Sequence, residues 1–384
     1  MPQYLAATGS LRSATKHGNY NAWLAHTGFE QYDVVAMFDP DHVPGPEYLT
    51  RTLGYFGADD VGFVQPPQVY YNQAASFVAR GGAEESYSYY STHLMASYAM
   101  GHTIVIGSHG VHRLSALRAL GGLPAHDAED LYLTMLYRAA GWRGVFVPEV
   151  LAMGMTPVDW PSYLRQQLRW SRSVLDLKLR VLPRMARWLP AFERLINLGH
   201  GAFYFRAMLI PVAYMLLAGM LVFNVAPAFT QPRAMLPLAA MLLLFGALDR
   251  FRQRFYLVPT LERGFHWRAS MMQLAKWPVF VRAIFEVAGG RQVPYLLTPK
   301  GSRAQHARAL APVHLGVAGA MAGAWWFGTL LHGSLTFPLP VFAGIVIALS
   351  IAIAGSDALP HPDAFGNGAY EARRREMGRP SAER

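Results

Sequence analysis

The stretch that decides the fold is Asp33-Val34-Val35-Ala36-Met37-Phe38-Asp39-Pro40-Asp41-His42. Its first part is a short apolar run typical of a buried strand, and a proline-containing turn marks the end of that strand. In sheets of parallel strands, ligands bind beyond the carboxyl ends of the strands. Two carboxylates one residue apart at that point, Asp39 and Asp41, can share a hard divalent cation that binds a diphosphate. Taken alone, the same pattern also fits a proline turn with solvated aspartates.

Three more short apolar runs follow, and each stops at a turn rich in proline or glycine: residues 61–64, 103–106 and 144–147. Stretches with helical periodicity lie between them: residues 74–98, 115–120 and 131–140. Strands that alternate with helices indicate an α/β domain with a largely parallel sheet. We therefore expect Asp39 and Asp41 at the ligand-binding edge of that sheet.

The composition separates a polar half from an apolar half. Of the 384 residues only 15% are charged, against about 25% in ordinary soluble domains, whereas 52% are apolar. Long apolar runs dominate after about residue 200, which indicates a globular half followed by a membrane half. The net charge of +10 comes partly from arginines beside apolar segments, such as Arg250 and Arg252, and this favours an anionic membrane surface over nucleic acid. The absence of cysteine excludes disulfides, thiol catalysis and cysteine metal sites.

Four apolar segments predict membrane spans: residues 207–223, 234–248, 313–332 and 337–355. A span needs about 20 residues, so the second segment is short. With four spans, the catalytic half, the loop 249–312 and the tail all face one side, where lysine and arginine concentrate. The positive-inside rule places that side in the cytoplasm. Because no signal peptide precedes the spans, we expect a multi-pass protein of the inner (plasma) membrane with a cytoplasmic catalytic domain.

Two further motifs carry functional groups. Glu129 and Asp130 begin a predicted helix, where acids suit the helix dipole, and one of them can instead serve as a general base. In Gln166-x-x-Arg169-Trp170, arginine can grip a phosphate, glutamine can hydrogen-bond it, and tryptophan offers a face for a sugar ring. An interfacial helix with a tryptophan anchor explains this second motif equally well.

Taken in order and followed by membrane spans, the three motifs resemble the processive family 2 glycosyltransferases, which include cellulose synthases, hyaluronan synthases and chitin synthases. The resemblance implies a GT-A-type (Rossmann-like) catalytic domain followed by interfacial helices and an α-helical transmembrane bundle. It also implies a role for each matching residue: Asp39 and Asp41 bind Mg²⁺ or Mn²⁺ and the UDP diphosphate, Asp130 is the general base, Gln166 and Arg169 lie at the diphosphate, and Trp170 binds the acceptor.

Two more stretches extend the resemblance. The run from Lys16 to Asn21 is similar to a Lys-x-Gly-Asn-x-Asn run just before the Asp-x-Asp strand, and it implies that Lys16 binds the nucleotide sugar. The stretch containing Tyr295, Thr298 and Lys300 is similar, more loosely, to the gating loop that closes over the nucleotide in cellulose synthases.

The resemblance departs from the family pattern at the start of the chain. The first family aspartate, on an early strand that binds the uridine, has no counterpart, and the usual N-terminal spans are missing, so we expect an N-terminally truncated member. The expected organisation is a partial catalytic domain (1–160), amphipathic interface helices (161–200), a transmembrane hairpin (201–250), a cytoplasmic interface helix with the gating-like loop (251–312), a second transmembrane hairpin (313–355) and a disordered cytoplasmic tail (356–384).

The expected function is that of a membrane-bound inverting glycosyltransferase. It would polymerise sugar from a UDP-sugar into an extracellular polysaccharide, a cellulose-like β-glucan or related polymer. Its partners would be the donor, the growing polysaccharide and the lipid bilayer, with room for export or accessory proteins and none for nucleic acid. Two alternatives stay open: non-processive transfer to a lipid carrier, and a catalytically inactive membrane component. Motif spacing does not encode the sugar or the linkage.

Overall fold

The computed structural model describes residues 15–255, 257, 262–291 and 310–356. Its strands are β1 (Val34–Met37), β2 (Val43–Pro44), β3 (Val61–Gln65), β4 (Val69–Tyr70), β5 (Gly110–Arg113), β6 (Arg143–Phe146) and β7 (Ala152–Gly154). The helices that accompany them are α2 (Lys16–Trp23), α3 (Phe29–Gln31), α4 (Tyr48–Leu53), α5 (Phe77–Ser88), α6 (Leu94–Ala99), α7 (Leu114–Ala119) and α8 (Glu129–Ala139).

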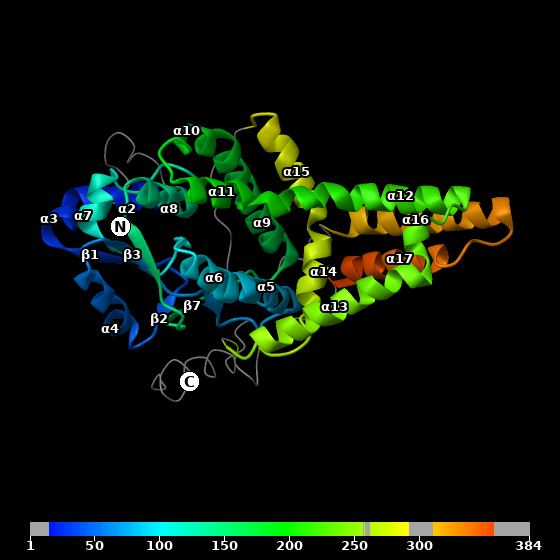
Figure 1. Cartoon of the computed structure of the whole chain (residues 1–384), viewed down its shortest axis with the longest axis horizontal. Coiled ribbons are helices and arrows are strands. Elements are labelled where there is room, and N and C mark those ends of the chain that lie inside the picture. Colours follow the sequence, from blue (N-terminus) through cyan, green and yellow to red (C-terminus); the bar gives the residue numbers. More distant parts are fainter. Residues whose placement is uncertain (1–14, 256, 258–261, 292–309, 357–384) are drawn as a thin grey trace.

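The second half of the described chain is helical. It contains α9 (Trp160–Asp176), α10 (Leu182–Met185), α11 (Ala191–Gly199), α12 (Leu209–Phe223), α13 (Pro232–Arg252), α14 (Trp267–Ala275), α15 (Trp277–Ala288), α16 (Ala311–His332) and α17 (Leu339–Gly355). Figure 1 shows the α/β part at one end, α12, α13, α16 and α17 at the other, and α9, α14 and α15 between them.

The main sheet has the strand order β1-β5-β3-β6. Strand β3 pairs with β6 in parallel, whereas β5 is antiparallel to both β1 and β3. Strands β1, β3 and β6 therefore run in one direction, and only β5 opposes them. A smaller sheet, ordered β2-β7-β4, lies beside the end of β1 through the short connection to β2.

The predicted strand at residues 103–106 is wrong. These residues are not in a sheet; the strand is β5, a few residues later, and it is antiparallel. The backbone N–H groups of Val105 and Ile106 donate to the side chains of Thr134 (2.9 Å) and Gln65 (3.2 Å) instead of to a neighbouring strand. Gly107, with φ of +77°, then turns the chain before it enters the sheet. Side chains thus satisfy polar groups that we expected a strand ladder to satisfy.

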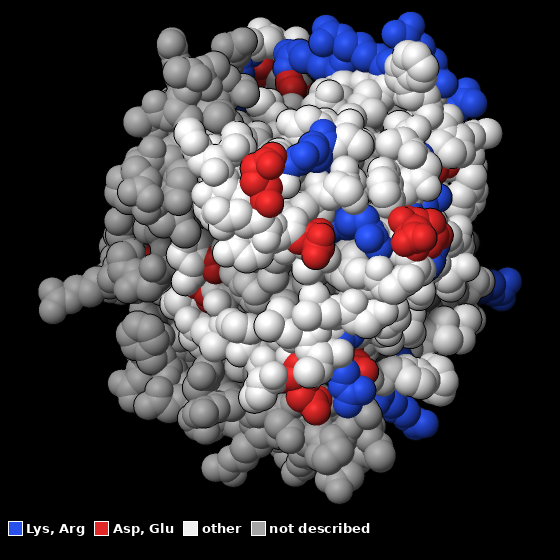
Figure 2. Space-filling view, turned by 90° about the vertical axis from the view of Figure 1, so that its left-hand side faces the viewer, with Lys and Arg blue, Asp and Glu red and all other residues white. Residues whose placement is uncertain are grey.

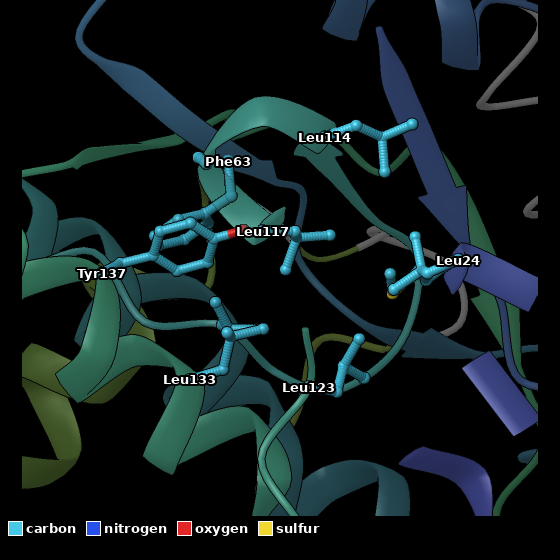
Figure 3. Close-up of a cluster of buried hydrophobic side chains, with 10 residues drawn as sticks. Leu24, Phe63, Leu114, Leu117, Leu123, Leu133 and Tyr137 are labelled. Atoms are coloured by element: carbon cyan, nitrogen blue, oxygen red, sulfur yellow. The ribbon is translucent and has the colours of Figure 1, made fainter. Parts of the chain in front are cut away.

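A hydrophobic core between the main sheet and helices α7 and α8 holds the α/β part together. Figure 3 shows its buried side chains: Leu24, Phe63, Leu114, Leu117, Leu123, Leu133 and Tyr137. The Phe63 ring lies so close to the backbone of β6 that a Cβ atom on Gly144 would be 2.3 Å from it. This close approach requires glycine at position 144.

The α/β end of the molecule carries mixed charge. Figure 2 shows acidic and basic side chains interspersed on this face, with lysine and arginine gathered along one edge. Exposed ion pairs of the chain, such as Arg118–Glu30 at 2.9 Å, contribute little to stability because water screens them.

Helix α11 is fastened to the α/β part by a buried carboxylate, Glu193, which is 1% exposed. Its Oε2 lies 2.6 Å from His102 Nδ1, and its Oε1 accepts a hydrogen bond of 2.7 Å from Arg138 Nε. We expect Glu193→Ala to lower the free energy of unfolding by about 2–3 kcal/mol, since it leaves a buried histidine and an arginine without their acceptor. Thermal unfolding in detergent measures this loss. The control is Glu30→Ala at an exposed pair, and an equal effect of both variants would contradict the prediction.

Helices α12, α16 and α17 pack against one another around Leu221, Met321, Leu339 and Ala343. A Cβ atom on Gly328 of α16 would lie 2.1 Å from the Leu221 carbonyl oxygen, so the two backbones cross closely at this glycine. Small residues allow such crossings between helices in membranes.

Two helical stretches are long and apolar enough to cross a bilayer, judged by length and composition: Ala191–Phe223, with 33 residues, and Pro232–Arg252, with 21. Helices α16 and α17 occupy the other two predicted spans, and α17 is apolar but has only 17 residues. Core helices of soluble proteins can share these properties, so the four-span bundle stays a prediction. The predicted interface helix within 251–312 is two helices, α14 and α15, which meet at Lys276.

Candidate active site

The amine of Lys16 joins three separate segments at the carboxyl end of β1. Thr15 caps α2 by accepting from the Gly18 amide at 3.2 Å, which places Lys16 in the first turn. Its Nζ lies 2.8 Å from Asp39 Oδ1 and 3.4 Å from Glu129 Oε1, and it donates to the Gly107 carbonyl oxygen. Burial opposes the charge of Lys16, but the two carboxylates outweigh it and raise the pKa, so this side chain stays protonated.

Asp39, Asp41 and His42 form a group in the turn that follows β1. One ligand atom of each lies within 4.8 Å of the others. The Asp39 amide donates to Ser108 Oγ at 3.2 Å, and Asp41 Oδ2 accepts from the Met155 amide at 3.2 Å. The turn is therefore fixed by the loop before β5 and by the segment after β7.

His42 is the buried member of this group, at 7% exposure. Its Nδ1 lies 3.5 Å from Asp41 Oδ1, and neither ring nitrogen makes a hydrogen bond within the described part of the chain. The ring stacks on His109 with 5.2 Å between centroids and lies against Gly154, where a Cβ atom would come within 2.5 Å of it. Burial lowers the pKa of His109 to about 3, with a further contribution from His42, so His109 stays neutral.

Asp130 stands at the start of α8. Its Oδ1 accepts from the Leu131 amide at 2.8 Å, and a Cβ atom on Gly107 would lie 3.0 Å from its Oδ2, so glycine permits the close approach. A cavity of about 20 Å³ touches its side chain, as well as Lys16 and Glu129. Surrounding protein still removes most of its hydration, and burial, followed by the charge of Glu129, raises the pKa of Asp130 to about 7. The carboxyl group can therefore accept or hold a proton near neutral pH.

Helix α9 carries Gln166, Arg169 and Trp170, of which Gln166 is buried and the other two are half-buried. Asp159 begins the helix by accepting from the Ser162 amide at 2.8 Å.

Two contacts place α9 beside the segment of Asp130. Leu131 and Leu168, the neighbours of Asp130 and Arg169 in sequence, pack against the same hydrophobic cluster. His126, shortly before Asp130, lies 3.2 Å from Asp176 at the end of the helix.

The structure thus brings Lys16, Asp39, Asp41 and Asp130 to one edge of the sheet, with α9 alongside. The gating-like residues Tyr295, Thr298 and Lys300 lie outside the described residues. The roles of all these residues stay predictions.

Sequence reasoning missed two contributors to the site. One is Glu129, which pairs with Lys16 in addition to preceding Asp130. The other is His42, whose position directly after Asp39-Pro40-Asp41 was the available signal, because imidazole and carboxylates together form metal sites.

Comparison with known proteins adds the family. The family model described as glycosyl transferase family group 2 matches residues 34–355. The chain belongs to this family. The match contains the Asp39–His42 turn, Asp130 and α9, and the sheet arrangement and this membership together support a GT-A-like fold.

Two curated relatives show where the family member lies. The chain is 28% identical over 167 residues to a UDP-forming cellulose synthase of Dictyostelium discoideum, in its catalytic chain, covering 42% of this chain and 16% of the relative. It is 30% identical over 164 residues to the probable glucomannan 4-beta-mannosyltransferase 1 of Arabidopsis thaliana, covering 42% of this chain and 30% of the relative. The matches span less than a third of either relative's length. The resemblance to cellulose synthase-like family 2 glycosyltransferases is therefore confirmed.

Among solved structures, the mannosyltransferase PcManGT from Pyrobaculum calidifontis, in complex with GDP-Man and Mn²⁺, is similar with a TM-score of 0.43 and 18% identity. This match covers 73% of this chain and 68% of that chain.

Proposed function

We propose that this family 2 glycosyltransferase moves a hexosyl residue from a nucleoside-diphosphate sugar to the end of a growing polysaccharide, with inversion, at the cytoplasmic face of a membrane. The observation that carries the proposal is the convergence at Lys16 Nζ, 2.8 Å from Asp39 and 3.4 Å from Glu129, of the segments that hold the carboxylate pair and Asp130. A charged amine, a carboxylate pair and a titratable carboxyl group are the parts that diphosphate departure requires.

The Asp39–Asp41–His42 group fits a divalent cation, Mg²⁺ or Mn²⁺. Carboxylate oxygens and an imidazole nitrogen suit such ions, and the buried His42 ring has no hydrogen bond to lose among the described residues. When bound there, the cation would neutralise charge that develops on the leaving diphosphate. Asp39 and Asp41 would hold it with His42, and Lys16 and Arg169 would bind the phosphate oxygens.

Asp130 is the proposed general base. The acceptor hydroxyl gives its proton to the Asp130 carboxylate while its oxygen bonds to the anomeric carbon from the side opposite the diphosphate. The bond between that carbon and the phosphate oxygen breaks, and the nucleoside diphosphate leaves with the electron pair. Trp170 would hold the terminal sugar of the acceptor on its ring face, with Gln166 nearby on α9.

The membrane arrangement is part of the proposal. Helices α12, α13, α16 and α17 would cross the bilayer, and the α/β part, α9, α14 and α15 would lie on the cytoplasmic side, where most of the basic residues fall. Large apolar side chains exposed along α13, including Leu242, Leu243 and Phe245, support a lipid environment for that helix.

The test is transfer by the purified full chain in lipid nanodiscs with Mn²⁺ and radiolabelled UDP-glucose or a nucleoside-diphosphate mannose. We expect release of nucleoside diphosphate together with a polymer that a matching glycanase degrades. A product limited to one sugar on a lipid would favour the lipid-carrier alternative. No release of nucleoside diphosphate from any donor, with intact folding, would favour the inactive membrane component.

The pH profile follows from Asp130. Because burial raises its pKa to about 7, only the ionised fraction can accept the hydroxyl proton. We expect kcat/KM to fall about tenfold per pH unit below that pKa and to level off above it. Initial rates between pH 5.5 and 8.5 measure this dependence. A flat profile down to pH 5.5 would contradict the assignment of the base.

A further inference from the structure

A buried ionic cluster outside the proposed site joins α5, α9 and α14. We call it the Glu85 cluster, and its members are Glu85, Tyr163, Gln167, Gln273 and Lys276. The Lys276 side chain is 3% exposed and that of Glu85 is 14% exposed. None of these side chains has a part in the transfer reaction described above.

Every donor of the Lys276 ammonium group is used inside the cluster. An ammonium has three N–H donors. They reach Tyr163 Oη at 3.2 Å, Gln167 Oε1 at 3.1 Å and the carboxylate of Glu85, which forms the ion pair. The Tyr163 hydroxyl donates onward to Glu85, so the lysine and the tyrosine share one carboxylate. This saturation leaves Lys276 no donor for a ligand and indicates a structural use of its charge.

The cluster is also electrostatically closed. The Lys276 amine lies 5.7 Å from the Tyr163 ring centroid and 5.3 Å from that of Phe280, both within cation–π range. Burial lowers the pKa of Lys276, and the Glu85 carboxylate opposes that shift. A buried charge of this kind persists only while its partner stays in place. Movement of α5, α9 or α14 away from the others would therefore expose or orphan a charge.

The two cluster members on α9 share a face with the predicted acceptor residue. Tyr163 and Gln167 are one helical turn apart, and Trp170 follows Tyr163 by about two turns of 3.6 residues. The next turn is anchored by Arg172, whose Nε lies 3.2 Å from Glu286 on α15. The cluster therefore fixes the half of α9 that leads into Trp170.

We propose that Lys276 is a positioning residue that fixes α9 against α5 and α14, so that Arg169 and Trp170 stand over the proposed transfer site. This inference rests on the proposed function. It assigns to Lys276 no contact with donor or acceptor.

A distance measurement tests the placement directly. The chain has no cysteine, so spin labels can be attached at Glu30→Cys on α3 and Arg165→Cys on the exposed side of α9. We expect a narrow distance distribution in the parent and in Lys276→Arg, and a broad or displaced one in Lys276→Met. In Glu85→Gln/Lys276→Met the buried charges are both gone, which protects folding, and the distribution should still be broad. A narrow distribution in this double variant would overturn the proposal.

Transfer rates provide the second arm. We expect Lys276→Met and the double variant to lose at least about 10-fold in kcat for transfer, as small misplacements of binding groups do, while KM for the donor stays within about twofold. Lys276→Arg should restore most of the rate. The matched control is Arg143→Met, which removes an ion pair with Asp60 on the surface and should leave kcat unchanged.

The outcomes separate this proposal from the proposed function. If the double variant regains both the parental thermal stability and kcat, the cluster serves charge balance alone and the positioning role is wrong. If the parent itself turns over no donor while the distance arm behaves as expected, the proposed function fails and the placement of α9 by Lys276 stands.

Discussion

Asp130→Asn will lower the rate of sugar transfer by about 10³-fold and leave binding of the nucleoside diphosphate nearly unchanged. Asparagine keeps the shape of the side chain and can still accept from the Leu131 amide, which Asp130 Oδ1 does at 2.8 Å. It cannot accept a proton from the acceptor hydroxyl. Single-turnover transfer and calorimetric titration with UDP and Mn²⁺ measure the two quantities separately.

Glu129→Gln is the matched control for that substitution. Glu129 neighbours Asp130 and contacts Lys16 at 3.4 Å, so its loss changes the local charge but not the proton acceptor. We expect a loss of only about 10-fold, together with a lower pKa for Asp130, since the negative charge of Glu129 helps to raise it. If Glu129→Gln proves as inactive as Asp130→Asn while Asp130→Asn retains substantial rate, the general base is Glu129.

The sequence predicted the elements whose hydrogen bonds are local or regular, and failed where side chains replaced a ladder. The run before Asp39 is a strand, β1, and the turn after it holds the carboxylates as expected. Residues 103–106 have the same apolar character, yet Thr134 and Gln65, far away in sequence, take their amides. Periodicity cannot reveal such partners, because they depend on tertiary placement.

The same limit applies to the site and its surroundings. Asp39, Asp41 and Asp130 were accessible from motif order, but the pairing of Lys16 with Glu129 and the burial of His42 were not. Lys276 was visible only as a charge that interrupts an apolar segment. Its partner Glu85 lies 191 positions away on α5, so only the fold shows that the interruption is an ionic contact between helices.

Removal of divalent metal will abolish transfer, and Asp41→Asn will lower it by about 10²-fold or more even with Mn²⁺ present. Asp41 presents one oxygen to the Met155 amide at 3.2 Å and the other toward His42, so asparagine preserves the turn but removes the negative charge that a cation needs. We expect the Mn²⁺ concentration for half-maximal rate to rise accordingly. Chelation with EDTA, followed by titration of Mn²⁺ or Mg²⁺ into parent and variant, measures both effects.

His42→Gln separates a ligand role from a packing role at the same group. Its ring is buried against His109 and Gly154, so the substitution disturbs packing as well as any nitrogen ligand. If His42 helps to hold the cation, the Mn²⁺ requirement rises about 10-fold while excess Mn²⁺ restores most of the rate. If it only packs, thermal stability falls and the Mn²⁺ requirement stays at the parental value. Asp60→Asn, at an exposed carboxylate paired with Arg143, is the control in which neither quantity should change. A full rate for Asp41→Asn after exhaustive chelation would mean that diphosphate departure relies on Lys16 and Arg169 without a metal.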